Sequence, residues 1–283
     1  MATTLREPER QTSRFLVRRF SKSGVYRVTD TVTREEPLEI RIAYSFKGTR
    51  RTESVAVTMR TPGHDEELAA GFLCSEGVIT RADDIAGIRA LGSSESNEVM
   101  VELSPEVDVE EWRLRRATLL SSACGLCGKR TIEGIPEVQA AGDDGLRVNP
   151  ELIYELPALL RQSQTAFDES GGLHAAGLVS PDGEMLSVFE DVGRHNALDK
   201  LIGAHLLERR LPLSGRFLFL SSRGSFELVQ KSLAAGCDML VTIGAPSSLA
   251  IEFARARGLT LIGFIREDHF NVYAGDSRLV ALG

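Results

Sequence analysis

The sequence has few of the features that mark membrane-spanning, secreted or nucleic-acid-binding proteins. No apolar run approaches the ~18 residues that a membrane-spanning helix needs, and the 283 residues include only four cysteines and one tryptophan. The first 22 residues carry six basic and two acidic side chains but no apolar segment of the kind found in secretory signals. We therefore expect a cytoplasmic protein without membrane contact, whose thiols stay reduced.

Composition and net charge narrow the class of protein further. Apolar residues make up 42% of the chain and charged residues 26%, which is typical of globular proteins and excludes wholesale disorder. The net charge of −7 argues against a nucleic-acid partner, because such binding depends on neutralising phosphates. The length fits one large domain or two ordinary ones, at roughly 150 residues per domain.

The first part of the chain predicts a flexible tail over residues 1–22 and a small α+β domain over residues 23–116. Apolar and polar residues alternate over residues 40–59, around a Lys-Gly-Thr break, which indicates an antiparallel hairpin. An acidic first turn and an apolar face predict a helix over residues 65–76. Alternation returns over residues 98–103 and predicts a strand.

The second part, residues 117–283, predicts an α/β domain with a partly parallel sheet. A helix is expected over residues 150–167, kinked or restarted at Pro157, followed by a hairpin around Ser180-Pro181-Asp182-Gly183. Three continuous apolar runs then alternate with helical patterns, as in a parallel sheet covered by helices. The expected strands are 217–220, 239–243 and 259–265, and the expected helices are 192–210, 225–235 and 246–257, with Asp191 as the cap of the first and Pro246 at the start of the last.

Three polar loops follow the three buried strands. The carboxyl ends of parallel strands share one sheet edge, so we expect these loops to meet there. Free backbone N–H groups at helix starts, together with Arg223 and Arg266, suit a phosphate-bearing, nucleotide-like ligand. No P-loop and no GxGxxG pattern is present, which disfavours ATP hydrolysis and NAD chemistry. The predicted ligand residues of the first two loops are Ser222, Arg223, Gly224, Ser225, Ala245, Pro246 and Ser247.

The sequence Cys124-Gly125-Leu126-Cys127 is the sharpest local motif. Two thiols at this spacing suit a redox pair, half of a zinc site, or a thiolate that carries sulfur as a persulfide, and the motif alone does not choose between them. If a helix starts at Ser122 or Ala123, its dipole favours the thiolate of Cys124 over that of Cys127. Cys74 and Cys237 are expected to be core thiols.

A third polar cluster stands at the expected strand-to-helix junction near Asp191. Arg194 and His195 lie in the first helical turn after Asp191. Capping of the helix does not require these two side chains, so we predict that they face the ligand. His174 is the other histidine in a plausible site position. A zinc deaminase would need a glutamate two residues after this histidine, where the chain has Ala176, so deaminase chemistry is disfavoured.

Four separated segments, taken in order, resemble one family, the FdhD formate dehydrogenase accessory sulfurtransferases. The similarity runs from about Tyr26 to the C-terminus. The segments are Ser122 to Lys129, Glu190 to Lys200, Ser222 to Lys231, and Ala245 to Ala250 continuing through Gly263-Phe264 to Phe270-Asn271-Val272-Tyr273.

The resemblance implies a dimeric cytoplasmic sulfur carrier whose C-terminal domain has a cytidine-deaminase-like fold. Such a protein takes sulfur from a cysteine desulfurase as a persulfide. It passes the sulfur to the molybdenum cofactor, a bis-molybdopterin guanine dinucleotide, for formate dehydrogenase, and GDP-like nucleotides can bind in place of that cofactor. The catalytic thiols would be Cys124 and Cys127. The family's cofactor-binding stretch maps onto Phe264, Ile265, Arg266, Glu267, Asp268 and His269, where Glu267-Asp268 replaces a more usual basic or glycine-containing pair.

Two other classes stay open on the residues alone: a thiol-disulfide oxidoreductase and a non-catalytic cofactor chaperone. For the carrier, we expect the glycine-flanked segment from Leu119 to Arg130 to be a loop that closes over the bound cofactor.

Overall fold

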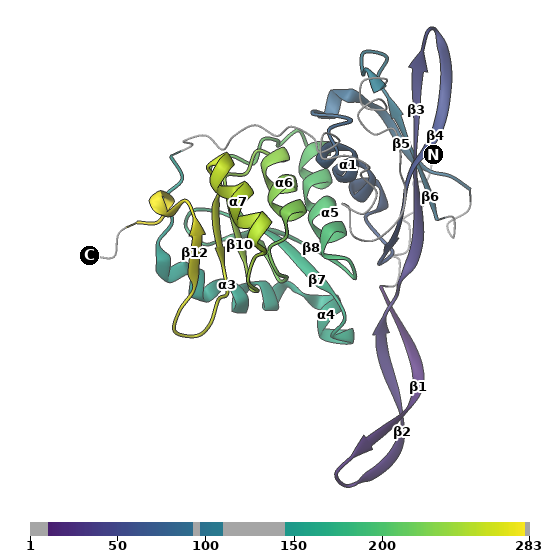
Figure 1. The fold of residues 1–283 in the computed structure, drawn as a ribbon. Coiled ribbons are helices and arrows are strands. Elements are labelled where there is room, and N and C mark those ends of the chain that lie inside the picture. Colours follow the sequence, from purple (N-terminus) through teal and green to yellow (C-terminus); the bar gives the residue numbers. More distant parts are fainter. Residues whose placement is uncertain (1–10, 93–96, 110–144, 281–283) are drawn as a thin grey trace.

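The computed structural model describes residues 11–92, 97–109 and 145–280, which form two sheets and a separate two-stranded ribbon (Figure 1). The predicted domain boundary at residue 116 and the segment with Cys124 and Cys127 lie outside these residues. Among the described residues, no helix is long and apolar enough to cross a membrane.

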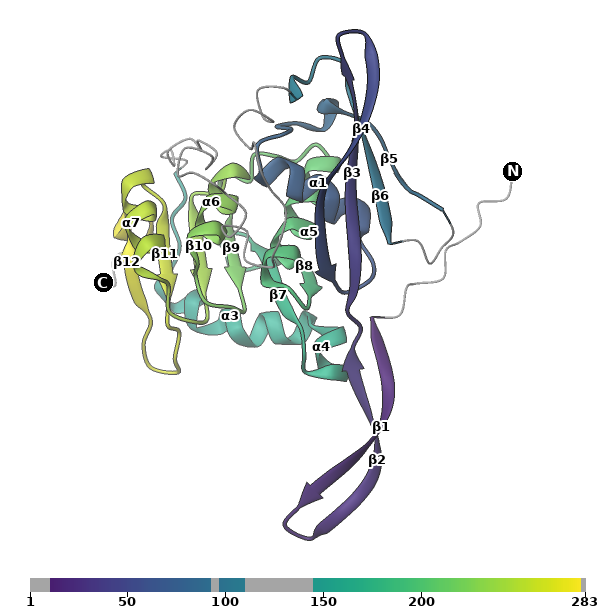
Figure 2. The ribbon, with the colours of Figure 1, turned by 45° about the vertical axis from the view of Figure 1, so that its right-hand side comes forward.

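The ribbon consists of β1 (Thr12–Ser21) and β2 (Gly24–Thr33), paired antiparallel along their full length. It projects away from both sheets (Figures 1 and 2). The prediction of a flexible tail is therefore wrong for residues 12–21. The strand escaped detection because Phe15, Leu16 and Val17 are consecutive apolar residues, so no period of two is visible.

The smaller sheet has the strand order β4-β3-β6-β5 and confirms the predicted hairpin and strand. β3 pairs antiparallel with β4 and parallel with β6, whereas β5 and β6 are antiparallel. The helix that follows β4 confirms the helix predicted over residues 65–76. The elements are β3 (Glu36–Phe46), β4 (Thr49–Arg60), α1 (Asp65–Ser75), the 3-10 turn η1 (Ala82–Asp84), β5 (Ile85–Ala90) and β6 (Glu98–Leu103).

The larger sheet has the order β12-β11-β10-β9-β7-β8 and is partly parallel, as predicted. β9, β10 and β11 run parallel, whereas β7, β8 and β12 each run antiparallel to a neighbour. The mixed α/β class is confirmed; the cytidine-deaminase-like relationship stays a prediction. The strands are β7 (His174–Val179), β8 (Met185–Asp191), β9 (Phe217–Leu220), β10 (Met239–Thr242), β11 (Thr260–Gly263) and β12 (Asn271–Ala274), followed by the 3-10 turn η3 (Asp276–Arg278).

Helices cover both faces of the larger sheet, which explains the continuous apolar strands. Leu218 and Leu220 of β9 belong to the core formed with α5, α6 and α7, whereas Phe217 and Phe219 belong to the core formed with α3. The helices are α3 (Pro150–Ser163), α4 (Thr165–Ser170), α5 (Arg194–Leu207), α6 (Phe226–Ala234) and α7 (Ser248–Arg257).

Three predicted helix boundaries are wrong. Helix α3 continues through Pro157, and the interruption falls at Gln164 instead. Gly193, not Asp191, is the N-cap residue of α5, because the Asp191 carboxylate is used in a buried ion pair. Helix α7 begins at Ser248, not at Pro246, and its N-cap residue Ser247 accepts from the Ala250 N–H at 3.3 Å.

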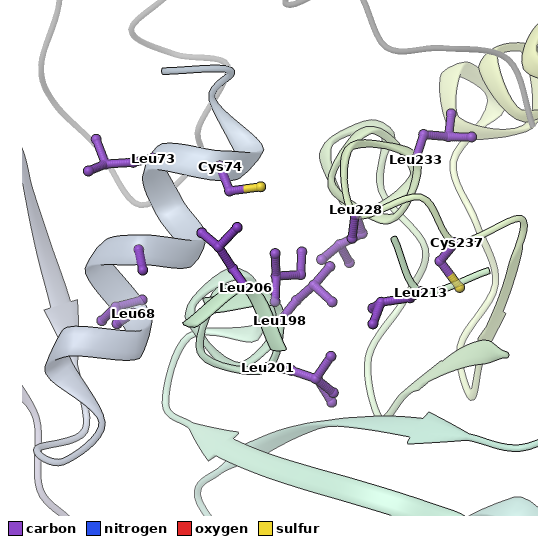
Figure 3. Close-up of a cluster of buried hydrophobic side chains, with 14 of the residues drawn as sticks. Leu68, Leu73, Cys74, Leu198, Leu201, Leu206, Leu213, Leu228, Leu233 and Cys237 are labelled. Carbon is purple, nitrogen blue, oxygen red and sulfur yellow. The ribbon is translucent and has the colours of Figure 1, made fainter. Parts of the chain in front are cut away.

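The two sheets are joined through helix α1, which packs on α5. The backbones approach so closely at Gly71 and Gly203 that a Cβ on Gly71 would lie 1.8 Å from the Asp199 carbonyl oxygen. Apolar side chains from α1, α5 and α6 form a single core around this crossing (Figure 3). The α1 crossing therefore fixes the smaller sheet relative to the larger one.

Candidate functional site

The three predicted loops do meet at the carboxyl edge of β9, β10 and β11. The Gly244 N–H donates to the Ser222 carbonyl at 3.1 Å, and the Ser247 N–H donates to the Gly224 carbonyl at 2.9 Å. The Phe264 N–H donates to the Gly244 carbonyl at 3.2 Å. The edge cluster, as we call residues 221–225, 244–247 and 264–269, is thus one hydrogen-bonded surface.

Glycine is required where these loops touch. A Cβ on Gly244 would lie 2.7 Å from Arg223 Cγ and 3.1 Å from Arg223 Cα. A Cβ on Gly263 would lie 2.8 Å from the Gly244 carbonyl oxygen. A real Cβ atom essentially never lies closer than 3.0 Å to another heavy atom, so a larger residue at Gly244 or Gly263 would force the neighbouring loop to shift.

Two helices begin at the edge cluster. The Ser225 hydroxyl caps α6 by accepting from the Leu228 N–H at 3.4 Å, and Ser247 caps α7. The remaining N–H groups of both first turns carry the partial positive charge of the helix dipole. The edge cluster therefore offers hydrogen-bond donors and a positive potential to an anion.

Arg223 and Arg266 add two exposed guanidinium groups to this edge. Arg266 stacks on Phe264, with its Cζ 3.9 Å from the ring centroid, and its Nη1 donates to the Ile265 carbonyl at 2.7 Å. Phe264 has a φ of 57°, in the left-handed region. The loop is closed by the Arg266 N–H, which donates to the His269 carbonyl at 2.8 Å.

The acidic pair in the last loop opposes this positive potential. Glu267 and Asp268 are both exposed, and Asp268 Oδ1 lies 2.7 Å from His269 Nδ1. This contact lowers the pKa of Asp268, so its carboxylate is charged at neutral pH. The two carboxylates weaken the attraction of this loop for anions and leave Arg266 as its main cation.

His174, Arg194 and His195 lie at the same edge, because β7 runs antiparallel to β9 and begins there. His174 Nδ1 is 3.4 Å from Ser221 Oγ, and the register places His174 opposite Asp191 at the end of β8. Burial lowers the pKa of His174, and the charges of Arg194 and His195 lower it further. His174 is therefore neutral at pH 7 and can both donate and accept a hydrogen bond.

Sequence reasoning missed Glu227 as a partner of His195. Glu227 Oε2 lies 2.9 Å from His195 Nε2, and Ser225 Oγ lies 3.4 Å from the same nitrogen. The side chains of His195 and Glu227 are mostly buried, with 14% and 11% of their surface exposed. The two residues are 32 positions apart in the sequence, and only the packing of α5 beside α6 reveals the pair.

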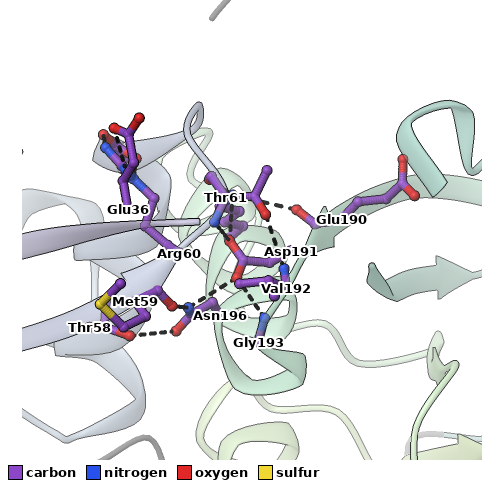
Figure 4. Close-up of polar contacts among 12 residues, drawn as sticks. Glu36, Thr58, Met59, Arg60, Thr61, Glu190, Asp191, Val192, Gly193 and Asn196 are labelled. Carbon is purple, nitrogen blue, oxygen red and sulfur yellow. Dashed lines mark hydrogen bonds and ion pairs between the residues drawn. The ribbon is translucent and has the colours of Figure 1, made fainter. Parts of the chain in front are cut away.

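Asp191 has a structural role beneath this edge. Its Oδ2 lies 2.8 Å from Lys200 Nζ, and both side chains are fully buried. Asp191 also accepts from the N–H groups of Thr61 and Gly193 (Figure 4). This network ties the end of β4 to the start of α5 and so supports Arg194 and His195.

Both described cysteines are buried, as predicted (Figure 3). Burial raises the pKa of Cys74 to about 12, and the neighbouring Asp199 carboxylate adds to this effect. Cys237 is fully buried at the end of α6. Neither thiol is therefore placed to act as a nucleophile at neutral pH, and within the described residues no three His, Cys, Asp or Glu side chains gather as a metal site.

Fold and site together define the class: a mixed α/β protein whose polar and cationic loops converge at one edge of a partly parallel sheet. The model of the FdhD/NarQ family matches residues 33–280. The chain belongs to this family.

Relatives from several organisms agree with this assignment. Proteins named sulfur carrier protein FdhD are 45% identical in Streptomyces coelicolor, over 95% of this chain and 96% of the relative, and 42% identical in Mycobacterium tuberculosis, over 93% and 96%. A relative of the same name in Saccharolobus solfataricus is 40% identical over 94% and 97%. A solved structure from Desulfotalea psychrophila, described as a candidate formate dehydrogenase accessory protein, has the same fold, with a TM-score of 0.72 and 22% identity over 96% of this chain and all of the other.

Proposed function

We propose that this protein is a sulfur carrier that takes sulfur from a cysteine desulfurase as a persulfide and delivers it to the molybdenum cofactor of a formate dehydrogenase. The observation that carries the proposal is the convergence of three donor-rich loops, with Arg223 and Arg266, in a member of the FdhD/NarQ family. The cargo, bis-molybdopterin guanine dinucleotide, has phosphates that such an edge suits.

The sulfur would be held by Cys124, with Cys127 as its partner. Cys74 and Cys237 are buried, which leaves the two cysteines of the CxxC motif for the chemistry. In the first step the Cys124 thiolate attacks the outer sulfur of the donor persulfide. The donor's S–S bond breaks, its cysteine leaves as a thiolate, and a new S–S bond forms on Cys124, without net oxidation.

In the second step the Cys127 thiolate attacks the inner sulfur of the Cys124 persulfide. A disulfide forms between Cys124 and Cys127, and the outer sulfur leaves as sulfide for the metal of the cargo. The two electrons that reduce this sulfur come from the two thiols, so a dithiol reductant must then regenerate the carrier.

The guanine dinucleotide ends of the cargo would rest on the edge cluster. Backbone N–H groups at the starts of α6 and α7 would donate to phosphate oxygens, and Arg223 and Arg266 would supply charge. Neutral His174 and the Glu227-supported His195 would contact the cargo from the β7 and α5 side. We also propose that the protein acts as a homodimer.

Intact mass spectrometry after incubation with a cysteine desulfurase and cysteine tests the carrier step. We expect a mass increase of one sulfur atom in the wild type and in Cys74→Ala, the matched control, and none in Cys124→Ala. Full loading of Cys124→Ala with none of Cys127→Ala would reverse the order of the two thiols. Reduction of insulin without any loading would identify a thiol-disulfide oxidoreductase instead.

Titration calorimetry with GDP tests the cargo site. Removal of a charge-assisted contact costs about 1.5–3 kcal/mol, so Arg223→Ala and Arg266→Ala should each weaken GDP binding by that amount. Arg209→Ala, at the far end of α5, is the control and should leave the affinity unchanged. Unchanged affinity in both site variants would remove the edge cluster from the proposal. Binding of GDP by a protein that never loads sulfur would favour a non-catalytic chaperone.

A further inference from the structure

The base of the ribbon contacts α4, which the Glu190 carboxylate holds to the end of β8. At its base, Thr12 Oγ1 donates to Glu169 Oε2 at 2.9 Å, and the Thr33 and Ser170 hydroxyls lie 2.8 Å apart. Both partners belong to α4, which ends four residues before His174 at the site edge. From this base the ribbon extends away from the body of the molecule (Figure 2). A protein held by the ribbon would therefore lie on the His174 side of the candidate site.

One face of the ribbon combines cations with exposed apolar side chains. Opposite residues in the register share a face, and one face carries the pairs Leu16 with Thr29 and Phe20 with Val25. Leu16 is 70% exposed and Phe20 is 73% exposed. The full basic face, as we call it, comprises Arg14, Leu16, Arg18, Phe20, Val25, Arg27, Thr29 and Thr31.

The basic face brings its cations close together. Arg18 stands directly opposite Arg27, and like charges at such a position destabilise a strand pair. Within residues 11–92, 97–109 and 145–280, no carboxylate forms an ion pair with either arginine. On the opposite face, by contrast, Arg19 lies 3.4 Å from Asp30. The basic face thus carries a repulsion that an acidic surface would remove.

We propose that the basic face docks an acidic protein surface with an apolar centre, on the enzyme that receives the cargo from the edge cluster. The inference rests on the proposed function for the identity of that enzyme. Burial of the exposed side chains of Leu16, Phe20 and Val25 requires an apolar surface on a protein partner. The net charge of −7 on the whole chain opposes extended contact with a nucleic acid, whereas a local acidic patch matches the three arginines.

Binding of the full chain to purified cofactor-free formate dehydrogenase tests the inference by biolayer interferometry. The ribbon variant is Arg14→Gln, Arg18→Gln and Arg27→Gln, which breaks no described ion pair and relieves the Arg18–Arg27 repulsion, so the ribbon stays folded. The control variant removes three exposed cations at the far end of α5, with Arg81→Gln, Arg209→Gln and Arg210→Gln. We expect binding at least about tenfold weaker for the ribbon variant, with a reduced salt dependence, and unchanged binding for the control.

Two results would overturn the inference. One is equal affinity of the ribbon and control variants for the enzyme. The other is loss of self-association of the ribbon variant in analytical ultracentrifugation with enzyme binding intact, which would assign the basic face to a second copy of this chain. GDP affinity separates this test from the proposed function, since the ribbon variant should bind GDP like the wild type. Failure of GDP binding in the wild type would count against the edge cluster and not against the ribbon.

Discussion

At the residue scale, the buried pair of Asp191 and Lys200 shows how one side chain supports both fold and site. Lys200 Nζ also donates to the Thr61 carbonyl at 2.9 Å. This one ammonium group thus pairs with the Asp191 carboxylate of the larger sheet and with a carbonyl that directly follows β4 of the smaller sheet. A buried ion pair gives little net stability compared with an apolar pair, but the loss of one partner leaves an uncompensated charge.

We therefore predict that Lys200→Met lowers the free energy of unfolding by about 3–5 kcal/mol, measured by urea denaturation. Addition of Asp191→Asn should recover part of the loss, because the orphaned charge is gone. The control is Arg209→Met, which removes an exposed pair with Asp83 at 2.7 Å and should cost less than about 1 kcal/mol. If Lys200→Met lowered the free energy of unfolding as little as Arg209→Met does, the Asp191–Lys200 pair would be solvated and the prediction would be wrong.

At the scale of elements, the crossing of α1 and α5 depends on two glycines. The approach at Gly71 and Gly203 leaves no room for a methyl group, because the backbone of the facing helix stands where it would go. The sequence predicts both helices but not this contact, since neither glycine stands at a helix end or a turn.

Gly71→Ala should therefore destabilise the protein, although alanine is the better helix former. We expect a loss of about 1–3 kcal/mol or more in the free energy of unfolding, because the helices must separate. The matched control is Gly87→Ala in β5, where a Cβ meets nothing within 4 Å; it should change stability by less than about 0.5 kcal/mol. Thermal unfolding of both variants by circular dichroism checks this, and a neutral Gly71→Ala would place the helices farther apart.

At the scale of the whole molecule, the two sheets share one core and one polar network. Asn196 of α5 donates to the Met59 carbonyl at 2.8 Å and accepts from the Thr58 hydroxyl at 3.1 Å, next to the Asp191 network (Figure 4). Units joined in this way lose packing on both sides when either opens.

We predict that the sheets unfold together. In native-state hydrogen exchange, the slowest amides of β3 and β10 should open with the same free energy, and Asn196→Ala should lower both values equally. Ser163→Ala, an exposed change at the end of α3, serves as the control and should lower neither. Exchange of β3 at a much lower free energy than β10 would show two independent folding units.

Elements whose signals are local could be predicted from neighbouring residues alone. Alternation located β3, β4 and β6, continuous apolar runs located β9, β10 and β11, and the rule for parallel strands brought their loops to one edge. These inferences succeed because hydrophobic period and strand direction are set within a few residues. The CxxC motif, and each of the four segments that carry the family resemblance, could likewise be recognised from neighbouring residues.

Features that depend on partners distant in the chain became visible only in the folded molecule. Asp191 looks like a helix cap until Lys200 and Thr61 surround it, and the contact of Glu227 with His195 spans 32 residues. The ribbon carries apolar and basic side chains on the same face, so burial imposes no period on its sequence. In each case the deciding free energy comes from burial and pairing across the fold, which no local pattern records.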